Sequence, residues 1–146
     1  MPNIEVNMFA IFLAVVANFF LGFLWYSKLF QKTWSIEMGF NPDEQPKKSD
    51  LFRSMGLALV GYFFLAYVLS HQIAVWNSQS WGLGASQWTP LSRAVQAAFF
   101  TWLGFFVPML LNGVAWAKHS WKLFFINASY HLVALFVVAF ILVFMG

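Results

Sequence analysis

The sequence contains no cysteine, and this absence removes several kinds of chemistry at once. The chain can form no disulfide, and it offers no thiolate as a nucleophile or as a metal ligand. Thiol oxidation coupled to a quinone is excluded for the same reason.

Charged residues are also scarce. They make up 9% of the 146 residues, whereas a soluble domain has about 25%. Hydrophobic residues make up 61%, which is too apolar a surface for water and predicts a membrane protein. The net charge of +3 comes from basic residues beside apolar runs, so it favours a role in membrane orientation. We expect the lipid bilayer, and no nucleic acid, as a partner.

Four apolar runs are each long enough to cross a hydrocarbon core, which takes about 20 residues. Backbone groups in lipid must be paired internally, so we expect helices, and no alternating pattern indicates a barrel. The runs are Ile4–Tyr26, Ser54–Trp76, Pro90–Trp116 and Lys122–Met145. The chain is thus predicted to be one all-α membrane domain, residues 1–146, built as a bundle of four transmembrane helices. Because its lysines follow the first run, we expect that run to be retained and not cleaved as a secretory signal.

The segment after the first run, residues 27–53, is polar, but Phe30, Trp34 and Met38 recur in it every four residues. This spacing predicts a short amphipathic helix lying in the membrane interface. Aromatic residues are enriched where the bilayer meets water. The residues predicted to anchor the chain there are Trp25, Tyr26 and Trp34.

The distribution of basic residues predicts the orientation of the chain. The first and third loops carry seven of them: Lys28, Lys32, Lys47, Lys48, Arg53, Lys118 and Lys122. The opposite side carries only Arg93. The positive-inside rule then places both loops in the cytoplasm and both termini on the extracytoplasmic side. We expect a multi-pass protein of the plasma membrane or a bacterial inner membrane.

Polar residues interrupt the apolar runs at similar depths. At a rise of about 1.5 Å per residue, one group lies about 12–14 Å from the cytoplasmic ends, and a second lies at about 6–8 Å. The first group is Asn18, Tyr62, Pro108, Tyr130 and His131, and the second is Asn112 and Asn127. We expect these side chains to form one polar layer that binds a ligand. Pro108 removes a helical hydrogen bond and is the predicted hinge.

The layer has two interpretations. Amides within membrane helices often only join one helix to another, at about 0.6 kcal/mol per hydrogen bond. An ionisable residue inside a membrane is by default a candidate for function, which singles out His131. Both interpretations stay open at this point.

Several chemistries are absent from the spans. No Asp or Glu lies within any span, so proton exchange of the glutamate-driven multidrug type lacks its carrier. The three histidines lie at different depths, which disfavours a metal site. No nucleotide-binding loop or serine-nucleophile motif is present. We therefore assign no catalytic residue, no metal and no cofactor.

The first run also carries small residues at i, i+4 spacing: Ala10, Ala14, Asn18 and Gly22. Small residues on one face let a second helix approach closely. We expect this stripe to contact another copy of the chain, forming a homo-oligomer, or a membrane protein partner.

Two motifs resemble a known family. The first runs from Asn18 through Gly22 to Trp25-Tyr26-Ser27, and the second is Phe124–His131 with Asn127 and Tyr130. Together they resemble a small membrane family catalogued as domain of unknown function 1761. The resemblance covers nearly the whole chain and implies a four-helix integral membrane protein. It implies no activity, cofactor or catalytic residue.

Three functions are consistent with these features. The leading hypothesis is a non-enzymatic protein that binds or transports a small molecule, lipid or ion through the polar layer. The second is a structural or accessory subunit of a larger membrane complex. The third is an intramembrane enzyme acting on a lipid or quinone, with His131 as acid and base. It ranks last because one histidine without a carboxylate is a sparse catalytic apparatus.

Overall fold

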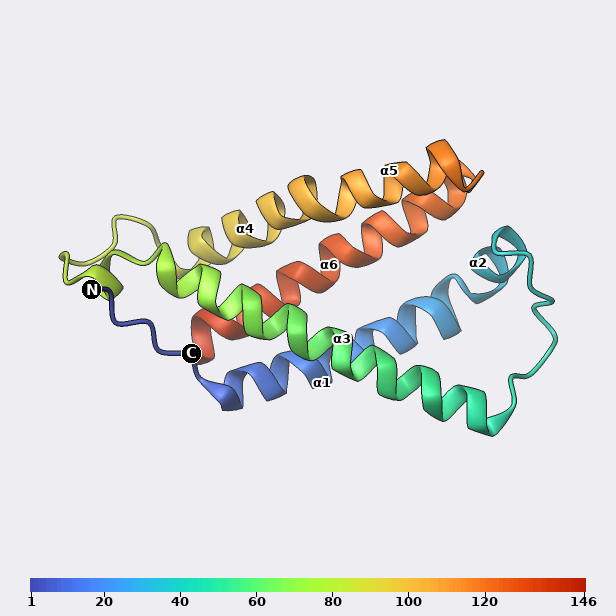
Figure 1. Ribbon diagram of the computed structural model, residues 1–146, viewed down its shortest axis with the longest axis horizontal. Coiled ribbons are helices and arrows are strands. Elements are labelled where there is room, and N and C mark those ends of the chain that lie inside the picture. Colours follow the sequence, from blue (N-terminus) through green and yellow to red (C-terminus); the bar gives the residue numbers. More distant parts are fainter.

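The computed structural model describes residues 1–146 as helices joined by loops, with no strand (Figure 1). Four helical stretches are long and apolar enough to cross a membrane, as predicted: Met8–Leu29, Lys48–Val75, Pro90–Trp116 and Trp121–Met145. The elements in order are α1 (Met8–Leu24), η1 (Trp25–Leu29), α2 (Gln31–Glu37), α3 (Lys48–Val75), η2 (Ser78–Trp81), α4 (Pro90–Thr101), η3 (Trp102–Phe106), α5 (Val107–Trp116) and α6 (Trp121–Met145).

Helix α6 is the centre of the bundle. It contacts α1, α3, α4 and α5, and Figure 1 shows it between the α4–α5 arm and the α1–α3 pair. Its sequence is apolar on every side, as expected for a helix that is surrounded by others. Fully buried alanines line the contacts between the helices and let their backbones approach closely. They are Ala10, Ala14, Ala66, Ala98 and Ala139.

Most of the apolar surface faces outward. Only 19 of the 146 residues are buried, and many phenylalanines are more than half exposed. Examples are Phe12, Phe52, Phe64, Phe100 and Phe125. Such a continuous apolar surface is typical of a protein whose solvent is lipid. The fold therefore agrees with the membrane class that the composition predicts.

The two ends of the bundle differ. Both termini lie at one end with the loop between α3 and α4, and the Asn7 amide donates a hydrogen bond to the Met145 carbonyl at 2.9 Å (Figure 1). We call this the terminal end. The other end holds α2, the loop 38–47 and the turn between α5 and α6, together with the lysines of the first and third loops. We call it the basic end.

Helix starts follow their capping residues in three of the four spans. The side chains of Asn7, Thr89 and Ser120 each accept a backbone N–H at the start of α1, α4 and α6. Helix α3 instead begins at Lys48, before the apolar run, and has no side-chain cap. Hydropathy detects only the apolar part of a helix. The predicted run therefore begins at Ser54, later than the helix itself, which begins at Lys48.

Two π-helical turns interrupt the spans, and neither was predicted from the sequence. In η1 the Phe30 N–H donates to the Trp25 carbonyl, and in η3 the Val107 N–H donates to the Trp102 carbonyl. Each bond spans five residues, so each turn holds one residue more than an α-helical turn would. Turn η3 ends two residues before Pro108, which has no N–H to give to the preceding turn. The irregularity predicted at Pro108 thus takes the form of a π turn on its N-terminal side.

Candidate functional site

The first π turn places two aromatic side chains against the N-terminal part of α6. The Trp25 indole N–H donates to the Ile126 carbonyl at 3.1 Å. The Tyr26 hydroxyl donates to the Asn127 amide oxygen at 2.7 Å. Both side chains are only half-buried, and each satisfies its polar atom on α6. The sequence predicts that Trp25 and Tyr26 anchor the chain at the membrane interface. Their hydrogen bonds to α6 are a contact that this prediction did not include.

The second π turn contacts the same part of α6. The Trp102 indole N–H donates to the Ala128 carbonyl at 2.8 Å. The Phe106 ring packs on the His131 imidazole, with the ring centroids 4.7 Å apart. Isolated π turns within α-helices are frequent at functional sites. In this chain both π turns contact the same short segment of α6, Ile126–His131. We take this segment as the candidate site.

A chain of hydrogen bonds joins three helices beside this segment. The Tyr130 hydroxyl lies 2.7 Å from the Asn18 amide oxygen and 3.2 Å from the Tyr62 hydroxyl. Tyr130 has one proton and the Asn18 oxygen can only accept, so Tyr130 donates to Asn18 and Tyr62 donates to Tyr130. Such a directional chain is cooperative, and it ties α1, α3 and α6 together. Asn18 is only 1% exposed, so this bond is shielded from solvent.

Gly22 makes room for the two hydroxyls. A Cβ atom at this position would lie 3.0 Å from the Tyr62 hydroxyl and 3.1 Å from the Tyr130 hydroxyl. Only a residue without a side chain allows both oxygens to approach α1 so closely. The glycine therefore belongs to the site, although the sequence showed it only as a member of the small-residue stripe.

His131 is the polar residue of the site that the chain leaves without a partner. Its ring lies between Phe106 and Tyr130, with the Tyr130 ring centroid at 5.0 Å. Of the three histidines only His71 makes a side-chain hydrogen bond, between its Nδ1 and the Tyr67 carbonyl at 2.8 Å. No three metal-ligating side chains come together anywhere in the structure.

The two motifs that resemble a family meet in space. Asn18 and Gly22 contact Tyr130, while Trp25 and Tyr26 contact Ile126 and Asn127. A family model described as a protein of unknown function, DUF1761, matches residues 9–143. The chain belongs to the DUF1761 family. No curated protein and no solved structure matches it.

The remaining predicted residues of this DUF1761 chain lie elsewhere. Asn112 and Pro108 are exposed on the outer surface of α5, and no side-chain hydrogen bond links Asn112 to the layer. Trp34 packs against Tyr26, with ring centroids 5.5 Å apart, and against Phe40 at 5.9 Å. The bundle therefore brings together Asn18, Tyr62 and Tyr130, pairs Asn127 with Tyr26, and leaves Asn112 outside.

Trp102 and Phe106 are site residues that sequence reasoning missed. A signal for Trp102 was available, because an indole N–H deep in an apolar run needs an acceptor. Nothing in the sequence indicated which helix would provide it.

The small-residue stripe on α1 is buried in contacts within the chain. Ala10, Ala14, Asn18 and Gly22 are all buried, and α1 contacts both α3 and α6. These residues cannot also contact a second copy. Homo-oligomerisation therefore stays a prediction, and the stripe no longer provides a reason for it.

Proposed function

We propose that this DUF1761 protein is a non-enzymatic binding protein that takes a small polar molecule, or the polar head of a lipid, at His131. One observation carries the proposal. His131 lies in a membrane-spanning helix beside a π turn, and the chain gives its ring nitrogens no partner, whereas Asn18, Tyr26, Tyr130 and Trp102 are all paired.

The cost of an unpaired polar group in lipid argues for a ligand. Such a group costs several kcal/mol in the hydrocarbon region because no water satisfies it. A neutral imidazole offers one donor and one acceptor, so it suits a ligand that can both accept and donate. A hydroxyl, amide or phosphate monoester group meets this requirement.

The second π turn provides a way to open the site. Phe106 covers one face of the imidazole and belongs to η3, which ends two residues before Pro108. A shift in this turn would uncover the ring without breaking the Tyr130 hydrogen bonds, which come from α1 and α3. Pro108 would then act as the hinge from its exposed position, and not as a ligand.

The basic end is proposed to face the cytoplasm, since it carries the lysines of the first and third loops. Both termini would then lie outside a plasma membrane or a bacterial inner membrane. The proposed binding site would then lie in the cytoplasmic half, because His131 is nearer to the start of α6 than to its end.

The His131→Phe variant tests the proposal, since it keeps an aromatic ring and removes both nitrogens. We expect native mass spectrometry of the wild-type chain, released from native-lipid discs, to show a reproducible bound mass. We expect that mass to be lost in His131→Phe and kept in His71→Phe. His71 is the matched control because its Nδ1 already contacts a carbonyl of its own helix. A bare wild-type chain, or equal loss in both variants, would contradict the proposal.

A second candidate function is favoured by α3. Between Lys48 and Phe64 this helix has no buried residue, and Figure 1 shows it extending away from the α4–α5 arm. A partner subunit or a second copy could cover this half, making the protein an accessory subunit. The same spectra test this function, because a stoichiometric protein partner or a dimer would appear as a distinct mass.

A further inference from the structure

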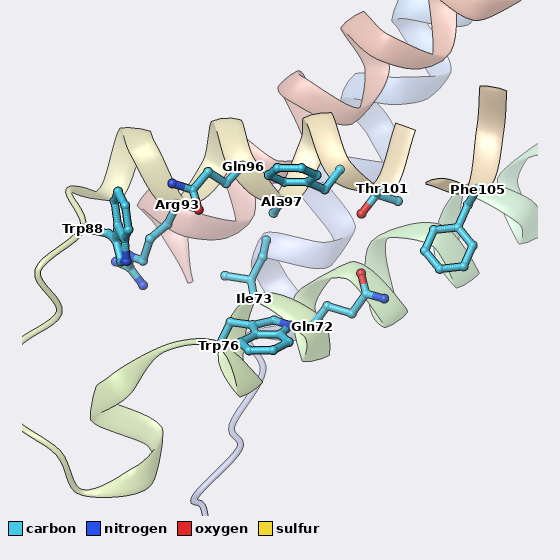
Figure 2. Close-up of a pocket in the computed structure, with 10 residues that line it drawn as sticks. Gln72, Ile73, Trp76, Trp88, Arg93, Gln96, Ala97, Thr101 and Phe105 are labelled. Atoms are coloured by element: carbon cyan, nitrogen blue, oxygen red, sulfur yellow. The ribbon is translucent and has the colours of Figure 1, made fainter. Parts of the chain in front are cut away.

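A pocket lies at the terminal end, away from the His131 site. It has a volume of about 450 Å³ and opens between α3 and α4 (Figure 2). Gln72 and Ile73 of α3 and Trp76, which directly follows α3, line one side of it, and Figure 2 shows them facing Gln96 and Ala97 of α4. This volume lies within the range of small-molecule sites, about 300–1,000 Å³.

Arg93 is the only charged residue that lines the pocket, and the chain does not neutralise it. Its Nε is shielded from solvent and has no hydrogen-bond partner. Glu5, the one acidic residue of the terminal end, instead accepts a bond from the Asn3 amide at 2.9 Å. The other acidic residues all lie between residues 37 and 50, at the basic end. A shielded N–H without an acceptor is costly, so an anion that accepts from the Arg93 guanidinium would stabilise it.

The position of Arg93 strengthens this argument. It lies close to the N-terminal end of α4, where the helix dipole disfavours a cation and favours an anion. An oxyanion bound at this position would interact favourably with the Arg93 guanidinium and with the dipole of α4. The amides of Gln72 and Gln96 lie along the same pocket and offer further donors.

The charged residue of the pocket lies at one end of it. Arg93 and Trp88 lie at one end in Figure 2, and Phe105 lies at the other. Along the helix, Phe105 is about 18 Å deeper into the bundle than Arg93. Trp76 and Trp88 are 86% and 59% exposed, as expected for side chains at a headgroup interface. The one charge of the lining thus lies at the end nearer the headgroup interface, and Phe105 lies at the deeper end.

We propose that this pocket binds an anionic amphiphile. Its oxyanion head, a phosphate or a carboxylate, pairs with Arg93, and its apolar part lies along Phe100 and Phe105. The site is separate from His131 and takes a different class of ligand. The proposal also explains Arg93. It is the only lysine or arginine on the side of the termini, and the positive-inside rule gives no reason for its position there.

The test is a lipid titration of the full-length chain in detergent, followed by native mass spectrometry. We expect one dioleoyl phosphatidylglycerol to be retained per chain in preference to dioleoyl phosphatidylcholine. Arg93→Gln should weaken its binding about tenfold or more, since it removes charge-assisted hydrogen bonds. Arg53→Gln is the control, because Arg53 is an exposed arginine of the basic end. Ala97→Leu, which fills the pocket without changing charge, should also lose the lipid.

Other outcomes would overturn the proposal. These are equal binding of the two lipids by the wild type, or equal binding by Arg93→Gln and Arg53→Gln. Inorganic phosphate that binds as tightly as phosphatidylglycerol would also overturn it, because the site would then recognise a soluble anion. If Arg93→Gln does not fold, two results still test the proposal. They are the preference of the wild type for phosphatidylglycerol over phosphatidylcholine, and the loss of phosphatidylglycerol in Ala97→Leu. His131→Phe should keep the phosphatidylglycerol, so the two proposals fail independently.

Discussion

Gly22→Leu is expected to destabilise the protein by about 2–3 kcal/mol, the upper range for overpacking a core position. The reason is the short distance from the Gly22 Cβ position to the hydroxyls of Tyr62 and Tyr130, 3.0 and 3.1 Å. A leucine must push both oxygens away, and Tyr130 then loses its 2.7 Å bond to Asn18. Reversible unfolding by SDS in mixed micelles measures the change.

Gly61→Leu is the matched control. Gly61 lies within the α3 span, and a Cβ there would meet nothing within 4 Å. We expect its free energy of unfolding to stay within about 0.5 kcal/mol of the wild type, as for other exposed positions. Equal destabilisation by the two leucines would show that Gly22 has no special contact with the hydroxyls.

Tyr130→Phe is expected to cost about 1–3 kcal/mol, because it leaves the Asn18 amide oxygen buried and unpaired. Asn18→Leu should cost less, since the Tyr130 hydroxyl keeps its contact with Tyr62 at 3.2 Å. The double variant should be clearly more stable than the sum of the single effects predicts. In the double variant no amide oxygen is left buried without a donor, because both partners of the Tyr130–Asn18 bond are removed.

A double-mutant cycle measured by SDS unfolding gives this coupling energy directly. Hydrogen bonds between membrane helices average only about 0.6 kcal/mol. A larger coupling is expected here because Tyr130 accepts from Tyr62 while it donates to Asn18, and Asn18 is fully buried. Additive single effects would contradict the directional chain from Tyr62 through Tyr130 to Asn18.

The contact among Asn18, Tyr62 and Tyr130 could be predicted from the sequence by depth alone. Each apolar run defines a helix, and the constant rise per residue converts a sequence position into a height in the membrane. Three polar residues at one height within a small bundle have few partners other than one another. The four spans and the short helix α2 follow from hydropathy and periodicity in the same way.

Rotation about the helix axis could not be predicted, and Asn112 shows why. Its predicted height matches that of Asn127, but its side chain is exposed on the outside of α5. The π turn η3 precedes Asn112 and adds one residue, which rotates every later position by about 100°. No local sequence signal marks a π turn. The face of α5 that packs against the bundle could therefore not be predicted from the sequence. The pocket at Arg93 depends in the same way on how α3 and α4 cross.

The measurement that tests the central claim most directly is nitrogen-15 NMR of the histidine side chains in native-lipid discs. His131→Phe assigns the His131 signals by their loss. The proposal predicts that the His131 ring nitrogens are hydrogen-bonded in native lipid and lose that bond when the chain is purified into one synthetic lipid. The His71 signals should stay unchanged, since its partner is the Tyr67 carbonyl. A His131 signal that is the same in both lipids would mean that no native ligand occupies the site.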